Sequence, residues 1–202
     1  MVKKRRMIVA ISGATGIIYG IRLLEVLKRL DIETHLVISQ SAQVTLNYET
    51  DMKMQELKEL ADVTYSVKDI GAAISSGSYQ TMGMIVAPCS IKTMSQIAYS
   101  MTDNLIARAA DVILKERKRL VLMLRETPLS LSHIRHMEAV TENGAIIFPP
   151  VPAFYTRPQT IDDIVNQTVG RVLDLFDIDT GEFKRWGEED SLENKKKVEN
   201  IK

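Results

Sequence analysis

Hydrophobic and polar positions follow one another along this chain in blocks that predict strands alternating with helices. Short, continuous apolar runs are typical of strands buried on both faces. They lie at residues 7–11, 34–38, 84–87, 120–124 and 145–148. Longer amphipathic stretches favour helices. They occupy residues 17–30, 41–48, 52–62, 103–116, 131–143 and 160–176. The alternation predicts an α/β protein with a Rossmann-like (flavodoxin-like) doubly wound parallel sheet in a three-layer αβα arrangement.

The pattern ends before the C-terminus. Residues 1–186 show one composition and no internal repeat, and are predicted to form a single α/β domain. Residues 187–202 form a charge-dense tail that is expected to be solvated. Residues 63–80 carry no continuous apolar run and are predicted to be a loop.

Residues 84–126 are the central stretch, predicted to run from a strand through a polar turn and a helix to a second strand. Pro88 cannot continue a hydrogen-bonded ladder, so we expect the chain to turn there. Asp103 is expected to cap the helix that follows the turn. Arg125 and Glu126 come directly after the second strand, where ligands bind in open parallel sheets.

The helix in this stretch has a charged face. Arg108, Asp111 and Lys115 are spaced i, i+3 and i+7, so they share that face. One interpretation is a surface ladder of ion pairs, each worth about 0.3–0.5 kcal/mol. The other is a cationic face directed at an anionic ligand.

The turn S-G-A-T-G at residues 12–16 connects the first strand to a helix. A glycine-rich turn before a helix N-terminus favours phosphate, because free amides and the helix dipole point at the anion. The turn matches neither G-x-G-x-x-G nor the P-loop pattern.

Small polar groups follow the other predicted strands as well, and the ends of parallel strands meet at one edge of a sheet. The groups at the five strand ends are Ser12-Gly13, Ser39, Cys89-Ser90, Arg125-Glu126 and Pro149-Pro150. They predict a pocket for a phosphorylated, polar heteroaromatic ligand. A hydrolase is disfavoured because G-x-S-x-G is missing from the sequence, and Cys89 is interpreted as a buried small residue.

Composition narrows the class of protein. The chain has 202 residues, 45% hydrophobic content and zero formal net charge, which gives no electrostatic argument for nucleic acid or membrane as a partner. One cysteine excludes an internal disulfide and fits a reducing compartment. The apolar run after the basic N-terminus is too short for a signal peptide, so a cytoplasmic protein is expected. His133 and His136 lack further metal ligands nearby, and no metal is expected.

Taken together, the motifs resemble those of the UbiX-type flavin prenyltransferases, a family formerly described as aromatic acid decarboxylases. The resemblance covers roughly residues 7–186, and its order of blocks is more specific than any one block. The blocks include S-G-A-T-G, Y-E-T-D, I-S-S-G-S, P-C-S-I-K-T, R-A-A-D-V-I-L-K-E-R, L-V-L-M-L-R-E-T-P and P-P-V-P-A-F-Y-x-R-P. The family joins the dimethylallyl group of dimethylallyl monophosphate to N5 and C6 of reduced FMN. The prenylated FMN then serves UbiD-type decarboxylases.

The resemblance implies roles for particular residues. The FMN site would contain Gly13, Ala14, Thr15, Ser39, Ser90, Ile91, Lys92, Thr93 and Arg125. The prenyl phosphate would be bound by Tyr155 and Arg171, with Lys115 and Arg108 reaching it across a subunit junction and Trp186 walling the apolar prenyl pocket. Glu126 would be the acid–base residue, with Glu49 as a second carboxylate. The resemblance also implies a homo-oligomer, commonly a dodecamer, and no metal.

Two departures from the family pattern concern loops. Thr15 stands where many relatives have serine, and Ser100 stands where some have glycine. Neither removes a charged site residue.

Two other functions stay open from sequence alone. One is a flavin-dependent decarboxylase of the peptidyl-cysteine type, which would not need Tyr155, Arg171 and Lys115. The other is a non-catalytic FMN carrier subunit. The pathway also stays open between ubiquinone synthesis and phenolic acid breakdown.

Overall fold

The computed structural model describes residues 4–181 and residue 185. The chain divides into two units, Met1–Val151 and Pro152–Lys202, and each is described by itself. The tail at 187–202 and Trp186 lie outside the described residues.

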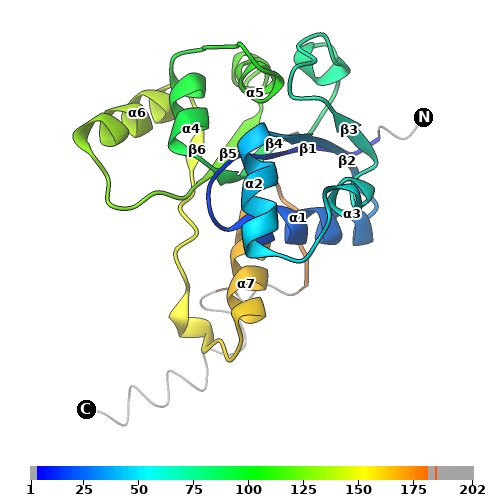
Figure 1. Cartoon of the computed structure of the whole chain (residues 1–202), viewed down its shortest axis with the longest axis vertical. Helices are drawn as coiled ribbons and strands as arrows, with labels where there is room; N and C mark the ends of the chain where they lie inside the picture. Colours follow the sequence, from blue (N-terminus) through cyan, green and yellow to red (C-terminus); the bar gives the residue numbers. More distant parts are fainter. Residues whose placement is uncertain (1–3, 182–184, 186–202) are drawn as a thin grey trace. The chain divides into compact units, whose positions relative to one another are not determined.

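Six parallel strands form the sheet of the first unit (Figure 1). They are β1 (Arg6–Ile11), β2 (Glu33–Ile38), β3 (Val63–Tyr65), β4 (Gly83–Cys89), β5 (Arg119–Leu124) and β6 (Ile146–Ile147). Their order is β3-β2-β1-β4-β5-β6. The chain thus builds outward from β1 in one direction and then resumes on its other side with β4. This order confirms the predicted doubly wound α/β sheet.

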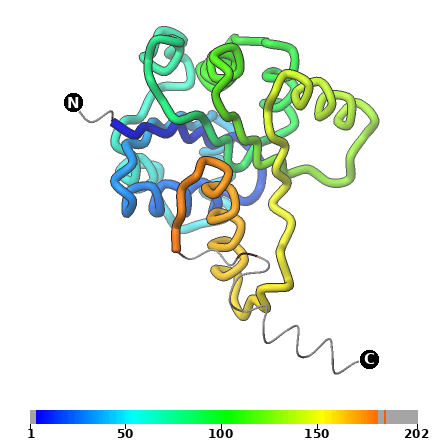
Figure 2. The backbone as a smooth tube through the Cα atoms, turned by 180° about the vertical axis from the view of Figure 1, so that it is seen from behind, coloured from blue at the N-terminus to red at the C-terminus, as the bar shows by residue number. Residues whose placement is uncertain are grey.

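Helices cover both faces of this sheet. The helices of the first unit are α1 (Ile17–Arg29), α2 (Gln40–Glu49), α3 (Met54–Glu59), α4 (Ile91–Ala98), α5 (Leu105–Lys115) and α6 (Leu131–Glu142), with a short 3₁₀ turn, η1 (Ala73–Ser75). Figures 1 and 2 show α1 on one face and α4 and α5 on the other. The three-layer arrangement follows from strands that are apolar on both sides.

The strand side chains alternate between the two faces. Ile8 and Ala10 of β1 belong to one buried cluster with Ile97 of α4 and Ile113 of α5. On α1, Gly20 lies against β4, because a Cβ there would be 2.5 Å from the carbonyl oxygen of Ala87. That close contact holds the first helix directly on the middle of the sheet.

Three expectations about local structure are wrong. Residues 63–65 form the edge strand β3, which the sequence did not reveal because it is short and only half-buried. The chain does not turn at Pro88, since β4 continues to Cys89 with a register shift between Val86 and Cys89, and a bulge of this kind accommodates proline.

The third concerns the start of α5. Asn104 caps this helix, with its Oδ1 accepting from the amide of Ala107 at 3.1 Å. Asp103, the expected cap, instead accepts from Nε2 of Gln96 at 2.8 Å. The two neighbouring residues are both good caps by type, so the sequence did not distinguish them.

The second unit contains η2 (Phe154–Thr156) and α7 (Ile161–Asp174). Thr160 caps α7. Its Oγ1 accepts from the amide of Asp163 at 3.1 Å, and the Asp163 carboxylate accepts from the amide of Thr160 at 2.9 Å. This reciprocal pair satisfies two amides at the helix start.

Candidate active site

The site residues of the first unit gather where the strand order reverses, between β1 and β4. In open α/β sheets ligands bind outside the carboxyl ends of strands at this point. Ser12 joins the two strand ends, donating from Oγ to the carbonyl of Pro88 (3.0 Å) and accepting from the amide of Ser90 (2.8 Å). Ser12 is 1% exposed, so its hydroxyl holds the edge together and is not presented to a ligand.

The turn after β1 leads into α1 through Gly16, which has φ 96° and caps the helix without a side chain. A carboxylate from another helix takes the place of a cap. Glu49, the last residue of α2, accepts from the amide of Gly16 (2.8 Å to Oε2) and the amide of Ile17 (3.0 Å). The positive end of α1 is therefore already neutralised by an anion of the protein itself.

The middle of the turn keeps two amides without a bond inside the protein. Ala14 donates its amide hydrogen to the carbonyl of Ser12 at 2.9 Å, whereas the described residues provide no acceptor for the amides of Gly13 and Thr15. Gly13 must be small, because a Cβ there would lie 2.2 Å from Oγ of Ser41. The turn thus packs tightly on the first turn of α2 and still presents amide donors at the sheet edge.

Serine residues begin the two helices that leave this edge. Ser39 caps α2 through the amide of Ala42 at 3.1 Å, and Ser90 caps α4 through the amide of Thr93 at 3.3 Å. Ser90 Oγ also donates to Oγ1 of Thr93 at 3.1 Å, and Thr93 is 7% exposed. Both serines therefore fix helix starts beside the candidate pocket.

Cations complete the edge. The amide of Arg125 donates to the carbonyl of Cys89 at 3.1 Å, which holds the start of the loop after β5 beside the end of β4. The Arg125 and Lys92 side chains are exposed and have no ion pair within the described part of the chain. Glu126 is also exposed, and its Oε1 accepts from the amide of Thr127 at 3.0 Å.

These groups fit a flavin mononucleotide. Free turn amides and an unpaired guanidinium suit a phosphate and the carbonyl oxygens of a planar ring. Residues 4–181 and 185 contain no group of three or more His, Cys, Asp or Glu side chains that could hold a metal ion.

Cys89 does not contribute a nucleophile. It is fully buried at the end of β4, and burial raises the pKa of its thiol far above the ordinary value. This agrees with its interpretation as a buried small residue.

The end of α5 that carries Lys115 lies away from this edge. Lys115 ends α5 four residues before β5 begins, and Arg125 follows the other end of β5. Six extended residues span about 20 Å. Within one copy of the chain, Lys115 therefore lies near the amino ends of the strands, whereas Arg125 lies at their carboxyl ends.

The ion pairs of that face differ from a simple ladder. Arg108 Nη1 lies 3.6 Å from Oδ2 of Asp111, while Lys115 Nζ lies 3.1 Å from Oε1 of Glu116. Lys115 thus pairs with its sequence neighbour, which the helical spacing did not indicate.

Two predicted site residues lie together in the second unit. Gln167 Nε2 of α7 donates to Oη of Tyr155 at 3.4 Å, and Arg171 lies one helical turn further along α7. Arg171 Nη1 pairs with Oδ2 of Asp174 at 3.0 Å, and Asp174 also pairs with Arg185. Their relation to the sheet edge stays a prediction, as does the role of Trp186, which lies outside the described residues.

The sequence placed Ser12 at the sheet edge but did not reveal that its hydroxyl bonds within the protein. Sequence reasoning missed two contributors to these contacts, Glu116 and Gln167. The glycine at the start of α1 was a signal that a distant group must satisfy the helix amides, whereas no comparable signal marked Gln167.

Comparisons with known proteins show which family the chain resembles. The sequence profile of the flavoprotein family matches residues 1–173. The flavin prenyltransferase UbiX of Escherichia coli (strain K12) is 60% identical over 185 residues, which cover 90% of this chain and 98% of that protein. The crystal structure of AnUbiX (PadA1) in complex with FMN and dimethylallyl pyrophosphate has a TM-score of 0.90 and 53% identity, covering 93% of this chain and 100% of that one.

Two further structures bear on assembly and on the rival function. The dodecameric FMN-dependent Ubix-like decarboxylase from Escherichia coli O157:H7 has a TM-score of 0.87 and 46% identity, covering 90% of this chain and 98% of that one. The peptidyl-cysteine decarboxylase EpiD has a TM-score of 0.62 at 17% identity, covering 87% of this chain and 100% of that one, a likeness that shows the fold alone. Among the described helices, none has the length and apolar character needed to span a membrane.

Proposed function

This chain belongs to the UbiX-type flavin prenyltransferase family, and we propose that it joins the dimethylallyl group of dimethylallyl monophosphate to N5 and C6 of reduced FMN. The supporting observation is the sheet edge at the β1–β4 reversal, where the amides of Gly13 and Thr15 and the guanidinium of Arg125 have no partner among the described residues. A flavin with one phosphate matches that donor set. AnUbiX, at 53% identity, has been crystallised with FMN and dimethylallyl pyrophosphate.

The FMN site is assigned to the turn and strand-end residues predicted from the sequence. Gly13, Ala14 and Thr15 would provide backbone contacts. Arg125 would hold the phosphate or a ring carbonyl by charge-assisted hydrogen bonds. Ser39 and the turn of residues 90–93 would line the rest of the pocket, with Ile91 and Lys92 as its side chains.

The prenyl phosphate would be held by a clamp of Tyr155, Arg171, Lys115 and Arg108. Phosphate leaves as an anion when the carbon–oxygen bond breaks, because both electrons of the bond stay on oxygen. Preorganised cations and hydroxyl donors stabilise that developing charge most strongly in a site that excludes water. Trp186 is assigned to the apolar wall around the prenyl group.

Reduced FMN, when bound, would supply N5 and C6, the two ring atoms that are alkylated. The N5 proton would leave as the phosphate departs, and the proton lost from C6 would balance the proton gained by the prenyl double bond when the ring closes. Glu126 is the residue assigned to accept the N5 proton and pass it to the departing phosphate. Its carboxylate is exposed and follows Arg125 at the sheet edge, which supports this assignment. Glu49 was assigned as a second carboxylate, yet its oxygens already accept two amides of α1. A positioning role for the turn fits Glu49 better than proton transfer.

The assembly follows from the same geometry. Lys115 and Arg125 lie at opposite ends of the strands, so a site that uses both requires a second copy of the chain. A dodecamer, as in the relative from Escherichia coli O157:H7, is the proposed state. The product, prenylated FMN, would pass to a UbiD-type decarboxylase.

The test is an anaerobic incubation of the assembled protein with reduced FMN and either dimethylallyl monophosphate or dimethylallyl pyrophosphate. Release of inorganic phosphate together with a heavier flavin is expected with the monophosphate. The rival decarboxylase would instead consume a peptide with a C-terminal cysteine, and a carrier subunit would bind FMN without changing it.

A further inference from the structure

The connection between β3 and β4, residues 66–82, approaches the end of α5 at Gly77. A Cβ built on Gly77 would lie 2.2 Å from Oε1 of Glu116 and 2.7 Å from its Cδ. Real Cβ atoms do not come so close to other heavy atoms, so only glycine leaves room for the carboxylate where it lies. Gly77 therefore leaves room for the Glu116 carboxylate, and a methyl group at this position would displace that side chain.

The same carboxylate oxygen holds Lys115. Lys115 Nζ donates to Oε1 of Glu116 at 3.1 Å, with the side chains 52% and 37% exposed. Glu116 is also the C-cap of α5, and its amide donates to the carbonyl of Val112 at 3.0 Å. The helix end thus fixes the backbone of Glu116, and its partly exposed side chain lies beside Gly77 and pairs with Lys115.

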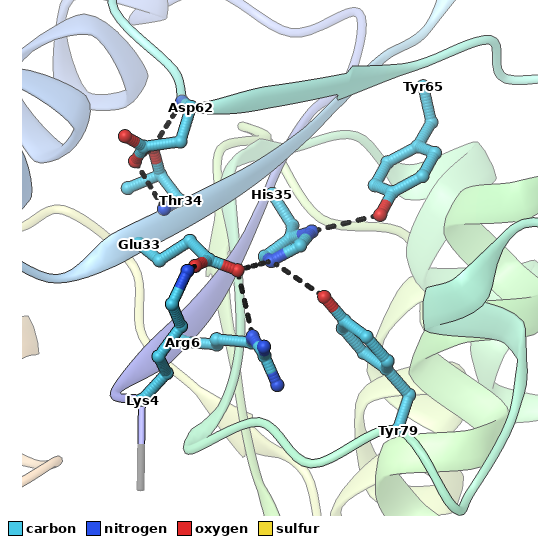
Figure 3. A network of polar contacts seen from close by, with 8 residues as sticks. All are labelled: Lys4, Arg6, Glu33, Thr34, His35, Asp62, Tyr65 and Tyr79. Atoms are coloured by element: carbon cyan, nitrogen blue, oxygen red, sulfur yellow. Dashed lines mark hydrogen bonds and ion pairs between the residues drawn. The ribbon is translucent and has the colours of Figure 1, made fainter. Parts of the chain in front are cut away.

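The connection that carries Gly77 is itself anchored at both ends on one buried side chain. His35 of β2 is 1% exposed. Its Nδ1 lies 3.0 Å from Oη of Tyr65, the last residue of β3, and its Nε2 lies 3.3 Å from Oη of Tyr79, two residues after Gly77 (Figure 3). The hydroxyls of Tyr65, just before the connection, and Tyr79, within it, therefore both contact one buried residue of the sheet, His35.

We propose that Glu116 is a positioning residue for the prenyl-transfer reaction: its carboxylate, for which Gly77 leaves room, holds the ammonium of Lys115 ready for the prenyl phosphate. The inference rests on the proposed function, in which Lys115 contacts that phosphate in the site of a neighbouring copy. Glu116 itself would contact neither substrate and would act only through Lys115.

The need for such a device follows from the chemistry of lysine. An exposed lysine has a flexible four-carbon stem, and an exposed ion pair alone restrains it weakly. A carboxylate on the neighbouring residue, whose backbone is held by the helix end, limits where the ammonium lies before substrate arrives. Positions held in advance reduce the entropy lost on binding and keep reacting groups aligned.

The experiment measures steady-state turnover of the assembled protein under anaerobic conditions with saturating reduced FMN and varied dimethylallyl monophosphate. The variants are Glu116→Gln, Gly77→Ala and Lys115→Ala, and the double variant Lys115→Ala/Glu116→Gln. Glu25→Gln is the matched control for Glu116, since Glu25 pairs with Arg22 at 2.9 Å and its side chain is 41% exposed. Gly71→Ala is the control in the same connection, because its Cβ would find its nearest neighbour at 3.7 Å.

Glu116→Gln and Gly77→Ala are each expected to raise the KM for the prenyl phosphate about three- to tenfold, the scale of a displaced positioning contact, with kcat and FMN affinity close to the parent. The two controls should keep the parent KM. In the Lys115→Ala background, Glu116→Gln should cause no further rise.

Other outcomes distinguish a failure of the Glu116 inference from a failure of the proposed phosphate clamp. If Lys115→Ala raises KM but Glu116→Gln does not, the positioning role is overturned and the proposed phosphate clamp stands. If Glu116→Gln raises KM equally with and without Lys115, Glu116 acts by another route and the inference fails. A parent KM in Lys115→Ala removes Lys115 from the clamp and this inference with it. Should Gly77→Ala fail to fold, the Glu116 series still decides the question.

Discussion

The carboxylate of Glu49 accepts the amide hydrogens of Gly16 and Ile17, with Oε2 at 2.8 Å and 3.0 Å, so one side chain of α2 closes the N-terminus of α1. These residues are separated by 33 and 32 positions in the chain. The contact changes how the S-G-A-T-G turn is understood. The helix end, which the sequence suggested as an anion site, already holds an anion, and the free donors lie earlier in the turn.

Replacing Glu49 by alanine should lower the free energy of unfolding by about 1–2 kcal/mol, because two amides at the helix start lose their acceptor. Glu49→Gln keeps one acceptor oxygen and should lose less, since only the charge–dipole part, about 0.3–1 kcal/mol, is removed. Urea unfolding measures both. Gln43→Ala, on the exposed surface of the same helix, is the control, and equal stability of Gln43→Ala and Glu49→Ala would contradict the cap.

Ser12→Ala should destabilise the protein by about 1–3 kcal/mol, because the amide of Ser90 would lose the oxygen that accepts its hydrogen in a buried site. Ser12→Cys, with a weaker acceptor, should fall between parent and Ser12→Ala. Thermal unfolding with and without FMN measures the effect. A loss of FMN affinity without a loss of stability would mean that the hydroxyl faces the ligand.

Arg125→Ala should weaken FMN binding by about 1.5–3 kcal/mol, the scale of a hydrogen bond to a charged group. Arg125→Lys keeps the charge but not the planar fork and should recover only part of this loss. Titration monitored by flavin fluorescence gives both affinities. Unchanged affinity in Arg125→Ala would place the flavin elsewhere.

Stability should depend on pH through Glu33. Hydrogen bonds from Lys4 (2.8 Å) and then from Arg6 (2.8 Å) lower the pKa of this carboxyl to about 2 from its ordinary 4.5 (Figure 3). A depressed pKa stabilises the folded state above the unfolded value, so this contribution is full above pH 4.5 and disappears as the pH falls towards about 2.

Glu33→Gln should therefore lower the free energy of unfolding at neutral pH by about 1 kcal/mol, since the partners are partly solvated, and should flatten its decline between pH 4.5 and about 2. Denaturant unfolding across this range measures the slope. Glu138→Gln, exposed on α6, is the control. The same slope in Glu33→Gln as in the parent would contradict the assignment.

Local patterns predicted the fold well because its determinants are local. Apolar runs such as β1 and β5, buried on both faces, have no other common interpretation, and the family inferred from the motifs is confirmed. The edge strand β3 was not predicted, because its three partly exposed residues show no alternation of apolar and polar side chains.

Contacts between distant residues were not predictable in the same way. Ser12 meets the Pro88 carbonyl across 76 positions, and nothing near either residue marks the pair. The close approach of Gly77 to Glu116 depends on how the β3–β4 connection folds back. Sequence reasoning identified which residue types gather at the sheet edge. The structure shows which of their hydrogen-bonding groups are already bonded within the protein.

This chain is proposed to prenylate reduced FMN, with Glu126 carrying the proton from N5 to the departing phosphate. The direct measurement is an anaerobic single turnover of parent and Glu126→Gln with dimethylallyl monophosphate, followed by the mass of the flavin. The parent should yield a flavin heavier by one C5H8 unit. Glu126→Gln should bind FMN normally and form that product about 10²–10⁴-fold more slowly, the scale for a positioned acid–base residue. An unchanged flavin mass in the parent, or the parent rate in Glu126→Gln, would contradict the claim.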